Sequence, residues 1–211
     1  MSPLVFVDTN VLVYAYDASD PLKNNRAREW RTRLWQQRRG RTSIQVLSEY
    51  YATLSRKLRV SADVAWDEAS AYFAWRPLAL DESVLRRARE VQRRYQLSWW
   101  DSMIVAAAQA QDCLVLLTED LQDGMAFGTL AVRSPFSTVV EEPAAIYEVS
   151  AAAPLHRPRG RPKRGSSDDA YEAAYRGWLA RQPFPLKGPP RPYPKREELY
   201  DRPVMRRGKK D

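Results

Sequence analysis

The sequence predicts an α/β fold, in which helices cover both faces of a mostly parallel sheet. Two short apolar runs, residues 5–7 and 114–117, are rich in valine and leucine and have the character of buried strands. Helical patterns alternate with these runs along the chain, and such alternation is typical of parallel sheets. The 211 residues suit one substantial domain with an appendage. We therefore expect a single α/β domain over residues 1–145.

Start and stop signals place the individual elements. A short helix is expected over residues 10–17, and a longer one runs from Pro21 to about residue 39, with Asp20 as its N-cap. Further helices are expected over residues 45–58, 61–75, 81–96 and 102–110, and further strands over 42–43, 78–80 and 129–132. The arginines on the 21–39 and 81–96 helices are expected to form solvent-exposed faces, and those on the 21–39 helix are also compatible with contact to a phosphate backbone.

The composition excludes several classes of enzyme and site. The one histidine, His156, lies in a Pro/Arg-rich stretch, so a Ser-His-Asp or Cys-His arrangement has no base within the domain. The single cysteine, Cys113, excludes an intramolecular disulfide and a multi-cysteine zinc site, and its neighbouring strand predicts a buried thiol. The start of the chain lacks a signal-peptide pattern, and no apolar run reaches membrane-spanning length. A soluble, cytoplasmic protein without membrane contact is expected.

The formal charge of +8 is distributed unevenly. Residues 1–150 contain 18 Lys and Arg and 19 Asp and Glu, for a net charge of −1. Residues 151–211 contain 16 and 7, for a net charge of +9, and they also hold ten of the fifteen prolines. Composition and charge change together, so residues 146–211 are expected to form a basic extension of the domain.

Four carboxylates stand at unusual places in the predicted elements. Asp8 and Asp120 follow strands, Glu49 lies in an apolar helix, and Asp101 lies in the first turn of another. Each has an ordinary explanation as a turn residue, a partly exposed side chain or, for Asp101 with Ser98, a capping box. Parallel topology, however, brings the ends of the Asp8 and Asp120 strands to one edge of the sheet. Crowded carboxylates favour a divalent cation, and oxygen ligands favour Mg²⁺ or Mn²⁺ over zinc.

Four segments of the chain resemble PIN-domain ribonucleases of the VapC toxin family. They are residues 5–11 (VFVDTNV), 48–49 (SE), 100–108 (WDSMIVAAA) and 116–124 (LLTEDLQDG), in the order and spacing of that family. The likeness extends over about residues 3–142. It implies a three-layer α/β/α PIN fold and a metal-dependent endoribonuclease that acts on RNA. It also implies the toxin of a toxin–antitoxin pair, commonly a homodimer with a cognate antitoxin.

The resemblance also implies roles for particular residues. Asp8 and Asp101 would be the main metal ligands, and Glu49 and Asp120 would complete the acidic pocket by holding a second metal or orienting the attacking water. The position of Asp123 is often acidic in the family. Thr9, Asn10 and Thr118 would support these carboxylates through hydrogen bonds. Glu119 stands where many relatives have a neutral residue, and it is expected to add charge or to point outward.

The extension contains a second resemblance, because residues 157–165 (RPRGRPKRG) resemble an AT-hook. In such a segment arginines enter the narrow minor groove of A/T-rich DNA, and the residues implied in binding here are Arg157, Arg159, Gly160, Arg161, Lys163 and Arg164. The same composition also fits a basic linker or nonspecific contact with RNA. An amphipathic helix is expected over about residues 168–181, and the rest of the extension is expected to be largely extended.

Several functions are compatible with these patterns. The leading interpretation is a Mg²⁺- or Mn²⁺-dependent endoribonuclease. A regulatory protein that binds nucleic acid on a PIN platform is an alternative, and so is a DNA nuclease of the same fold. The extension is expected either to tether nucleic acid or to inhibit the domain by placing an arginine in the acidic pocket.

Overall fold

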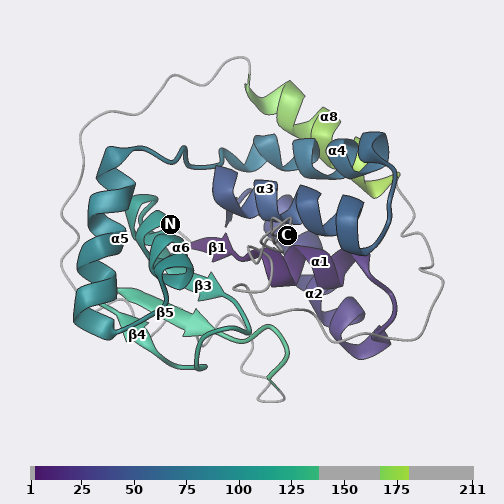
Figure 1. Cartoon of the computed structure of the whole chain (residues 1–211). Coiled ribbons are helices and arrows are strands. Elements are labelled where there is room, and N and C mark those ends of the chain that lie inside the picture. Colours follow the sequence, from purple (N-terminus) through teal and green to yellow (C-terminus); the bar gives the residue numbers. More distant parts are fainter. Residues whose placement is uncertain (1–2, 138–166, 181–211) are drawn as a thin grey trace, which may run out of the picture.

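The computed structural model describes residues 3–137 and 167–180, and one five-stranded sheet lies at its centre (Figure 1). The strands are β1 (Leu4–Val7), β2 (Gly40–Arg41), β3 (Cys113–Leu117), β4 (Ala126–Phe127) and β5 (Leu130–Arg133). Their order is β2-β1-β3-β5-β4, and every pairing is parallel except that of β4 with β5. The predicted α/β class with a mostly parallel sheet is confirmed.

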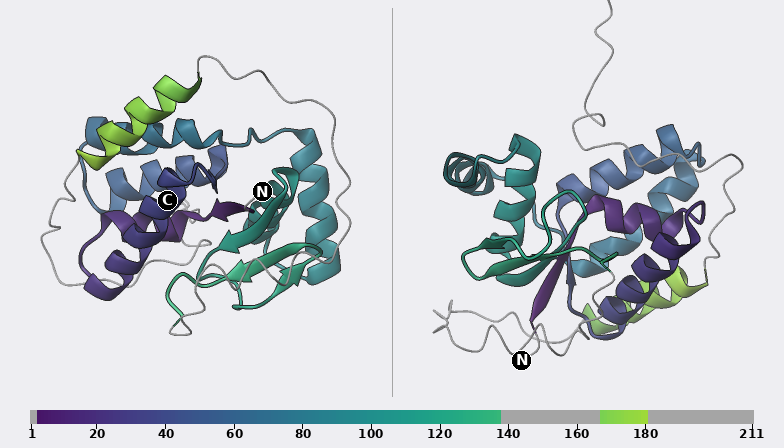
Figure 2. Two further views of the ribbon diagram at one scale, coloured as in Figure 1. Left: turned by 180° about the vertical axis from the view of Figure 1, so that it is seen from behind. Right: turned by 90° about the horizontal axis from the view of Figure 1, so that it is seen from below.

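Seven α-helices in the described ranges surround this sheet. They are α1 (Thr9–Tyr16), α2 (Pro21–Gln36), α3 (Ile44–Ala52), α4 (Ala62–Ala71), α5 (Glu82–Tyr95), α6 (Trp99–Ala110) and α8 (Ser167–Leu179). A π-helical turn (Thr53–Lys57) continues α3, and a 3-10 turn (Tyr72–Trp75) continues α4. The views in Figure 2 show α5 and α6 on one face of the sheet and α1 to α4 on the other, which makes three layers. None of these helices is long and apolar enough to span a membrane.

Polar side chains begin each of the first six helices. Asp20, for example, accepts hydrogen bonds from the amides of Leu22 and Lys23 at 3.1 Å, as its position before Pro21 predicted. The other N-caps are Asp8, Ser43, Ser61, Asp81 and Ser98. The cap of α1 is therefore the same carboxylate that ends β1, and the strand and the helix meet at Asp8.

The expected edge strands differ from those observed. β2 lies at Gly40–Arg41 and not at residues 42–43. The expected strand over 78–80 is wrong, because Leu78 makes only an isolated bridge with Ser43 before Asp81 caps α5. β4 was not predicted, since two residues before a turn at Gly128 (φ 68°) show no strand periodicity.

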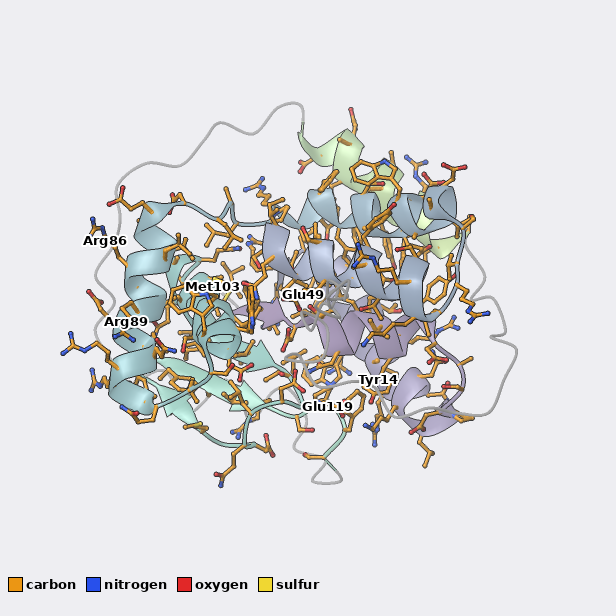
Figure 3. The ribbon with its side chains drawn as sticks, in the orientation of Figure 1. Tyr14, Glu49, Arg86, Arg89, Met103 and Glu119 are labelled. Atoms are coloured by element: carbon orange, nitrogen blue, oxygen red, sulfur yellow. The ribbon has the colours of Figure 1, made fainter. Side chains whose placement is uncertain are left out.

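The arginine-rich helices differ in how far they follow the sequence prediction. Arg86 and Arg89 on α5 are exposed and point away from the sheet (Figure 3). The expectation is wrong for Arg39, which follows α2 and is 7% exposed, and for Arg31 on α2, which is also only 7% exposed. Its guanidinium donates to the hydroxyl of Tyr72 at 3.4 Å and lies 4.4 Å from the ring of Trp178. This face of α2 is covered by other parts of the chain.

The cover is α8, which packs on the domain through aromatic rings. The hydroxyl of Tyr171 donates to the carbonyl of Trp35 at 2.7 Å, and the ring of Trp178 stacks on that of Trp35 with centroids 6.0 Å apart. Arg38 forms ion pairs with Asp168 and Glu172 at the edge of this contact. Trp178 belongs to the hydrophobic core, so α8 adds to the buried apolar area of the domain.

Gly40 provides a first test of this packing. A Cβ at this position would lie 2.6 Å from the indole ring of Trp75, which is fully buried and has no room to move. Gly40→Ala is therefore expected to destabilise the protein by about 2 kcal/mol and to lower the melting temperature by about 5 °C. Thermal unfolding followed by circular dichroism measures this shift.

Gly177→Ala is the matched control. Gly177 lies within α8, and a Cβ there would meet nothing within 4 Å. Alanine is the better helix former by about 1 kcal/mol, so this variant is expected to be as stable as wild type or more so. Equal shifts in the two variants would contradict the close contact of Gly40 with Trp75.

Candidate active site

Asp8 lies where the end of β1 meets the start of α1. Its side chain is fully buried, and its Oδ1 accepts a hydrogen bond from the Thr9 amide at 2.6 Å. The Asp8 amide donates to the carbonyl of Leu117 at 3.1 Å, which joins this point to the end of β3. A carboxylate is thus fixed at the carboxyl edge of two neighbouring parallel strands, where ligands bind in open α/β sheets.

Thr118 connects Asp8 to the segment that follows β3. Its buried hydroxyl donates to Asp8 Oδ2 at 2.7 Å. The hydroxyl oxygen of Thr118 also accepts hydrogen bonds, from the side-chain amide of Asn10 at 3.1 Å and from the backbone amide of Asp120 at 3.1 Å. One hydroxyl therefore orients the Asp8 carboxylate and holds the backbone of Asp120 next to it.

Glu49 reaches the same group of residues from α3. Its side chain is 4% exposed, and its Oε2 accepts a hydrogen bond from the hydroxyl of Thr9 at 2.8 Å. Its Oε1 accepts from the side-chain amide of Gln45 at 2.9 Å, one turn earlier on the helix. Thr9 therefore contacts both buried carboxylates, Asp8 through its amide and Glu49 through its hydroxyl. Gln45 was not predicted, although its i, i+4 spacing to Glu49 was a usable signal.

Asp101 lies in the first turn of α6 and takes part in its cap. The Asp101 amide donates to Ser98 Oγ at 3.1 Å, and Ser98 Oγ donates to Asp101 Oδ2 at 2.8 Å. The twelve residues of α6 span about 18 Å, and the five residues of β3 span about 17 Å. Because α6 leads back into β3, its N-terminal turn lies near the edge of the sheet at which β3 ends.

The remaining acidic residues follow β3 and have different surroundings. Asp120 is exposed, and its amide is held by Thr118. Asp123 is exposed and accepts a hydrogen bond from the Ser134 amide at 2.9 Å, so it joins this segment to the residue after β5. Glu119 neither points freely outward nor adds an uncompensated charge, because it pairs with the ammonium of Lys23 at 2.6 Å.

The donor chemistry of this group fits a hard cation. Asp8 and Glu49 are buried on either side of Thr9, and like charges in such surroundings raise each other's energy unless a cation is close. The buried Asn10 Oδ1 has no hydrogen-bond partner among the described contacts and is a further oxygen donor. Within residues 3–137 and 167–180, no three Asp, Glu, His or Cys side chains are already arranged as a metal site. The oxygens present suit Mg²⁺ or Mn²⁺ in type.

The basic residues of the extension belong to a separate part of the chain. The AT-hook-like residues implied in DNA binding lie outside the described ranges: Arg157, Arg159, Gly160, Arg161, Lys163 and Arg164.

Comparison with known proteins agrees with the fold. The PIN-domain family model matches residues 5–122, which is more than half of the 211-residue chain. This range includes Asp8, Glu49, Asp101 and Asp120. A search among curated proteins finds no match. The chain therefore belongs to the PIN-domain family, whose members are generally nucleases that depend on a divalent metal ion.

Proposed function

We propose that this PIN-domain protein is an endoribonuclease that hydrolyses RNA phosphodiester bonds with Mg²⁺ or Mn²⁺. The observation that carries this proposal is the hydrogen-bonded group of Asp8, Thr9, Glu49 and Thr118 at the carboxyl edge of the sheet. Its carboxylates are oriented before any substrate arrives, and such preorganised charge is what electrostatic catalysis requires.

The residues of the candidate active site would have different roles. Asp8, Asp101 and Asp120 would hold the ion, with Asn10 and Thr118 in support. When bound, a divalent ion makes hydroxide available near neutral pH and stabilises negative charge on the phosphodiester. Glu49 is fixed by Gln45 and Thr9 and would accept a proton from the attacking water. Asp123 stays an outer member of the group, because its contact with Ser134 supports the segment after β3.

The test is cleavage of defined substrates by the purified full-length chain. Single-stranded RNA is expected to be cut with Mg²⁺ or Mn²⁺ and left intact with EDTA. Because water attacks and the ribose hydroxyl does not, the products are expected to carry no 2′,3′-cyclic phosphate. Cleavage that persists in EDTA, or RNA that stays intact with both metals, would contradict the proposal.

The VapC resemblance supports a more specific role. We infer that the protein is the toxin of a type II toxin–antitoxin system, acts as a homodimer in the cytoplasm and has a cognate antitoxin. Expression is expected to arrest growth, and co-expression of a small protein encoded next to it is expected to restore growth. Unimpaired growth with active nuclease present would contradict the toxin role.

A second candidate function is favoured by the charge of the extension. Residues 151–211 carry a net charge of +9 and include the AT-hook-like segment. These features suit a DNA nuclease, or a regulatory protein that uses the PIN domain as a platform on A/T-rich DNA. The cleavage assay is therefore also run with DNA. Cleavage of DNA in preference to RNA supports a DNA nuclease, and binding without cleavage supports a regulatory protein.

A further inference from the structure

Lys23 contacts a carboxylate, a hydroxyl and two aromatic rings. Its ammonium donates to Glu119 Oε2 at 2.6 Å and to the hydroxyl of Tyr14 at 3.1 Å. It also lies 4.4 Å from the centroid of the Tyr14 ring and 5.0 Å from that of Phe136. These four side chains come from α1, α2, the segment after β3 and the segment after β5. The side chain of Lys23 is still 33% exposed, so the cation is held in place but accessible.

The two aromatic rings form the other part of this environment. Tyr14 and Phe136 meet edge to face with centroids 5.1 Å apart, and both are partly exposed. Partial burial raises the pKa of Tyr14 to about 12, so its hydroxyl is neutral at physiological pH. Burial disfavours the charged form of Lys23, but hydrogen bonds to Glu119 and Tyr14 outweigh it and raise the pKa of Lys23, so the lysine keeps its charge. We call these four residues the Lys23 cluster.

The Lys23 cluster is joined directly to the candidate active site. Glu119 stands between Thr118, which donates to Asp8, and Asp120, whose amide Thr118 holds. Glu119 and Tyr14, which both contact the Lys23 ammonium, are labelled below the α1 ribbon in Figure 3, and Glu49 is labelled above it. A positive charge flanked by aromatic rings therefore borders a group of buried carboxylates.

We propose that the Lys23 cluster binds single-stranded nucleic acid beside the acidic group, with Lys23 on a backbone phosphate and the rings of Tyr14 and Phe136 against a base. The inference rests on the proposed nuclease function and names the side chains that would hold its substrate. Carboxylates repel a polyanion, so the strand needs a cation near the point of cleavage. A cation beside aromatic rings is the combination that binds single strands, whereas the bases of a duplex are stacked away from such rings.

Glu119 explains how Lys23 is kept ready for a phosphate. In the free protein the carboxylate neutralises and orients the ammonium. A phosphate oxygen can then replace Glu119, and the lysine exchanges one anionic partner for another. Glu119 thus competes with the substrate, and its removal frees the lysine.

A purely structural role makes a different prediction for the same residues. If the ion pair only joins α2 to the segment after β3, Lys23→Met and Glu119→Gln both reduce the affinity for nucleic acid. If the cluster binds nucleic acid, the two variants act in opposite directions. The sign of the effect of Glu119→Gln on binding therefore separates the two roles.

Binding is measured with the full-length chain and a short fluorescent single-stranded RNA in EDTA, so that no cleavage occurs. Lys23→Met is expected to weaken binding about tenfold at low salt and to reduce the slope of log affinity against log salt by about 0.7. Glu119→Gln is expected to tighten binding about threefold. Arg26→Met removes an exposed cation from the same helix and is expected to change affinity less than about twofold.

Crosslinking separates this cluster from the basic extension. RNA that carries 4-thiouridine is irradiated with the full-length chain in EDTA, and crosslinked peptides are identified by mass spectrometry. Crosslinks to peptides with Tyr14 or Phe136 are expected. Crosslinks confined to residues 151–211, equal affinity of wild type and Lys23→Met, or preference for duplex RNA would overturn the inference.

The double variant Lys23→Met/Glu119→Gln controls for stability. It leaves neither partner charged, so its melting temperature is expected to equal that of wild type while binding stays weak. Recovery of binding together with stability would show a structural tether and overturn the inference. A further outcome is that the wild type binds RNA with the expected crosslinks, and Lys23→Met and Glu119→Gln change affinity in opposite directions, while no cleavage is detected. That result counts against the proposed nuclease function alone.

Discussion

Asp8→Asn is expected to reduce metal-dependent RNA cleavage by about a thousandfold or more. Asp8 is fully buried, and its two oxygens are oriented by the Thr9 amide and the Thr118 hydroxyl. Asparagine keeps the size of the side chain but removes the charge that would hold a divalent ion. Initial rates on single-stranded RNA with saturating Mg²⁺ measure the effect.

The same substitution is expected to leave the fold intact. Asparagine is as good an N-cap as aspartate, so α1 keeps its start. The altered hydrogen bond with Thr118 costs about 1 kcal/mol, and this cost is offset because one of two neighbouring buried charges is lost. We expect a melting temperature within about 3 °C of wild type.

Asp81→Asn is the matched control for Asp8→Asn. Asp81 is likewise the N-cap of a helix, α5, but it accepts from the amide of Val84, three residues on, at 3.0 Å, and it is exposed. Its substitution is expected to leave the cleavage rate unchanged. Full activity of Asp8→Asn, or equal losses in both variants, would contradict the assignment of Asp8 to the site.

Trp178→Ala is expected to produce the largest loss of stability. The indole is 6% exposed, stacks on Trp35 at an interplanar angle of 14° and covers the guanidinium of Arg31 at 4.4 Å. Removing a buried tryptophan costs about 3 kcal/mol, which corresponds to a fall in melting temperature of about 6–12 °C. Thermal unfolding followed by circular dichroism measures it.

The neighbouring residue Leu179 provides the comparison for Trp178. Its side chain is 51% exposed, so Leu179→Ala is expected to change the melting temperature by less than about 2 °C. If Trp178→Ala has as small an effect, then α8 does not contribute to the stability of the domain as its packing on Trp35 indicates.

The elements that carry the site could be predicted because their signals are local. The apolar run before Asp8 predicted β1, Asp20 before Pro21 predicted the start of α2, and the alternation of strands with helices predicted the parallel sheet. From that topology, the Asp8 and Asp120 positions follow at one edge of the sheet. Glu49 was recognisable as a charged residue in an apolar helix.

What was missed depends on contacts between distant segments. The ion pair between Lys23 and Glu119 leaves no periodic pattern, because its partners are 96 positions apart. An amphipathic pattern predicted an apolar face on α8 but did not identify Trp35 as its partner. Arg31 was expected in solvent for the same reason, since its cover comes from a part of the chain beyond residue 166.

Because α8 packs on Trp35, the basic segment is attached to the domain on both sides. Residues 138–166 run from the segment after β5 to a helix that returns to the domain, so residues 157–165 are tethered at both ends. Twenty-nine residues have a contour length of at most about 100 Å. If these arginines bind nucleic acid as proposed, the number of residues between the two anchored ends sets how far from the PIN domain that nucleic acid is held, and thereby its local concentration there.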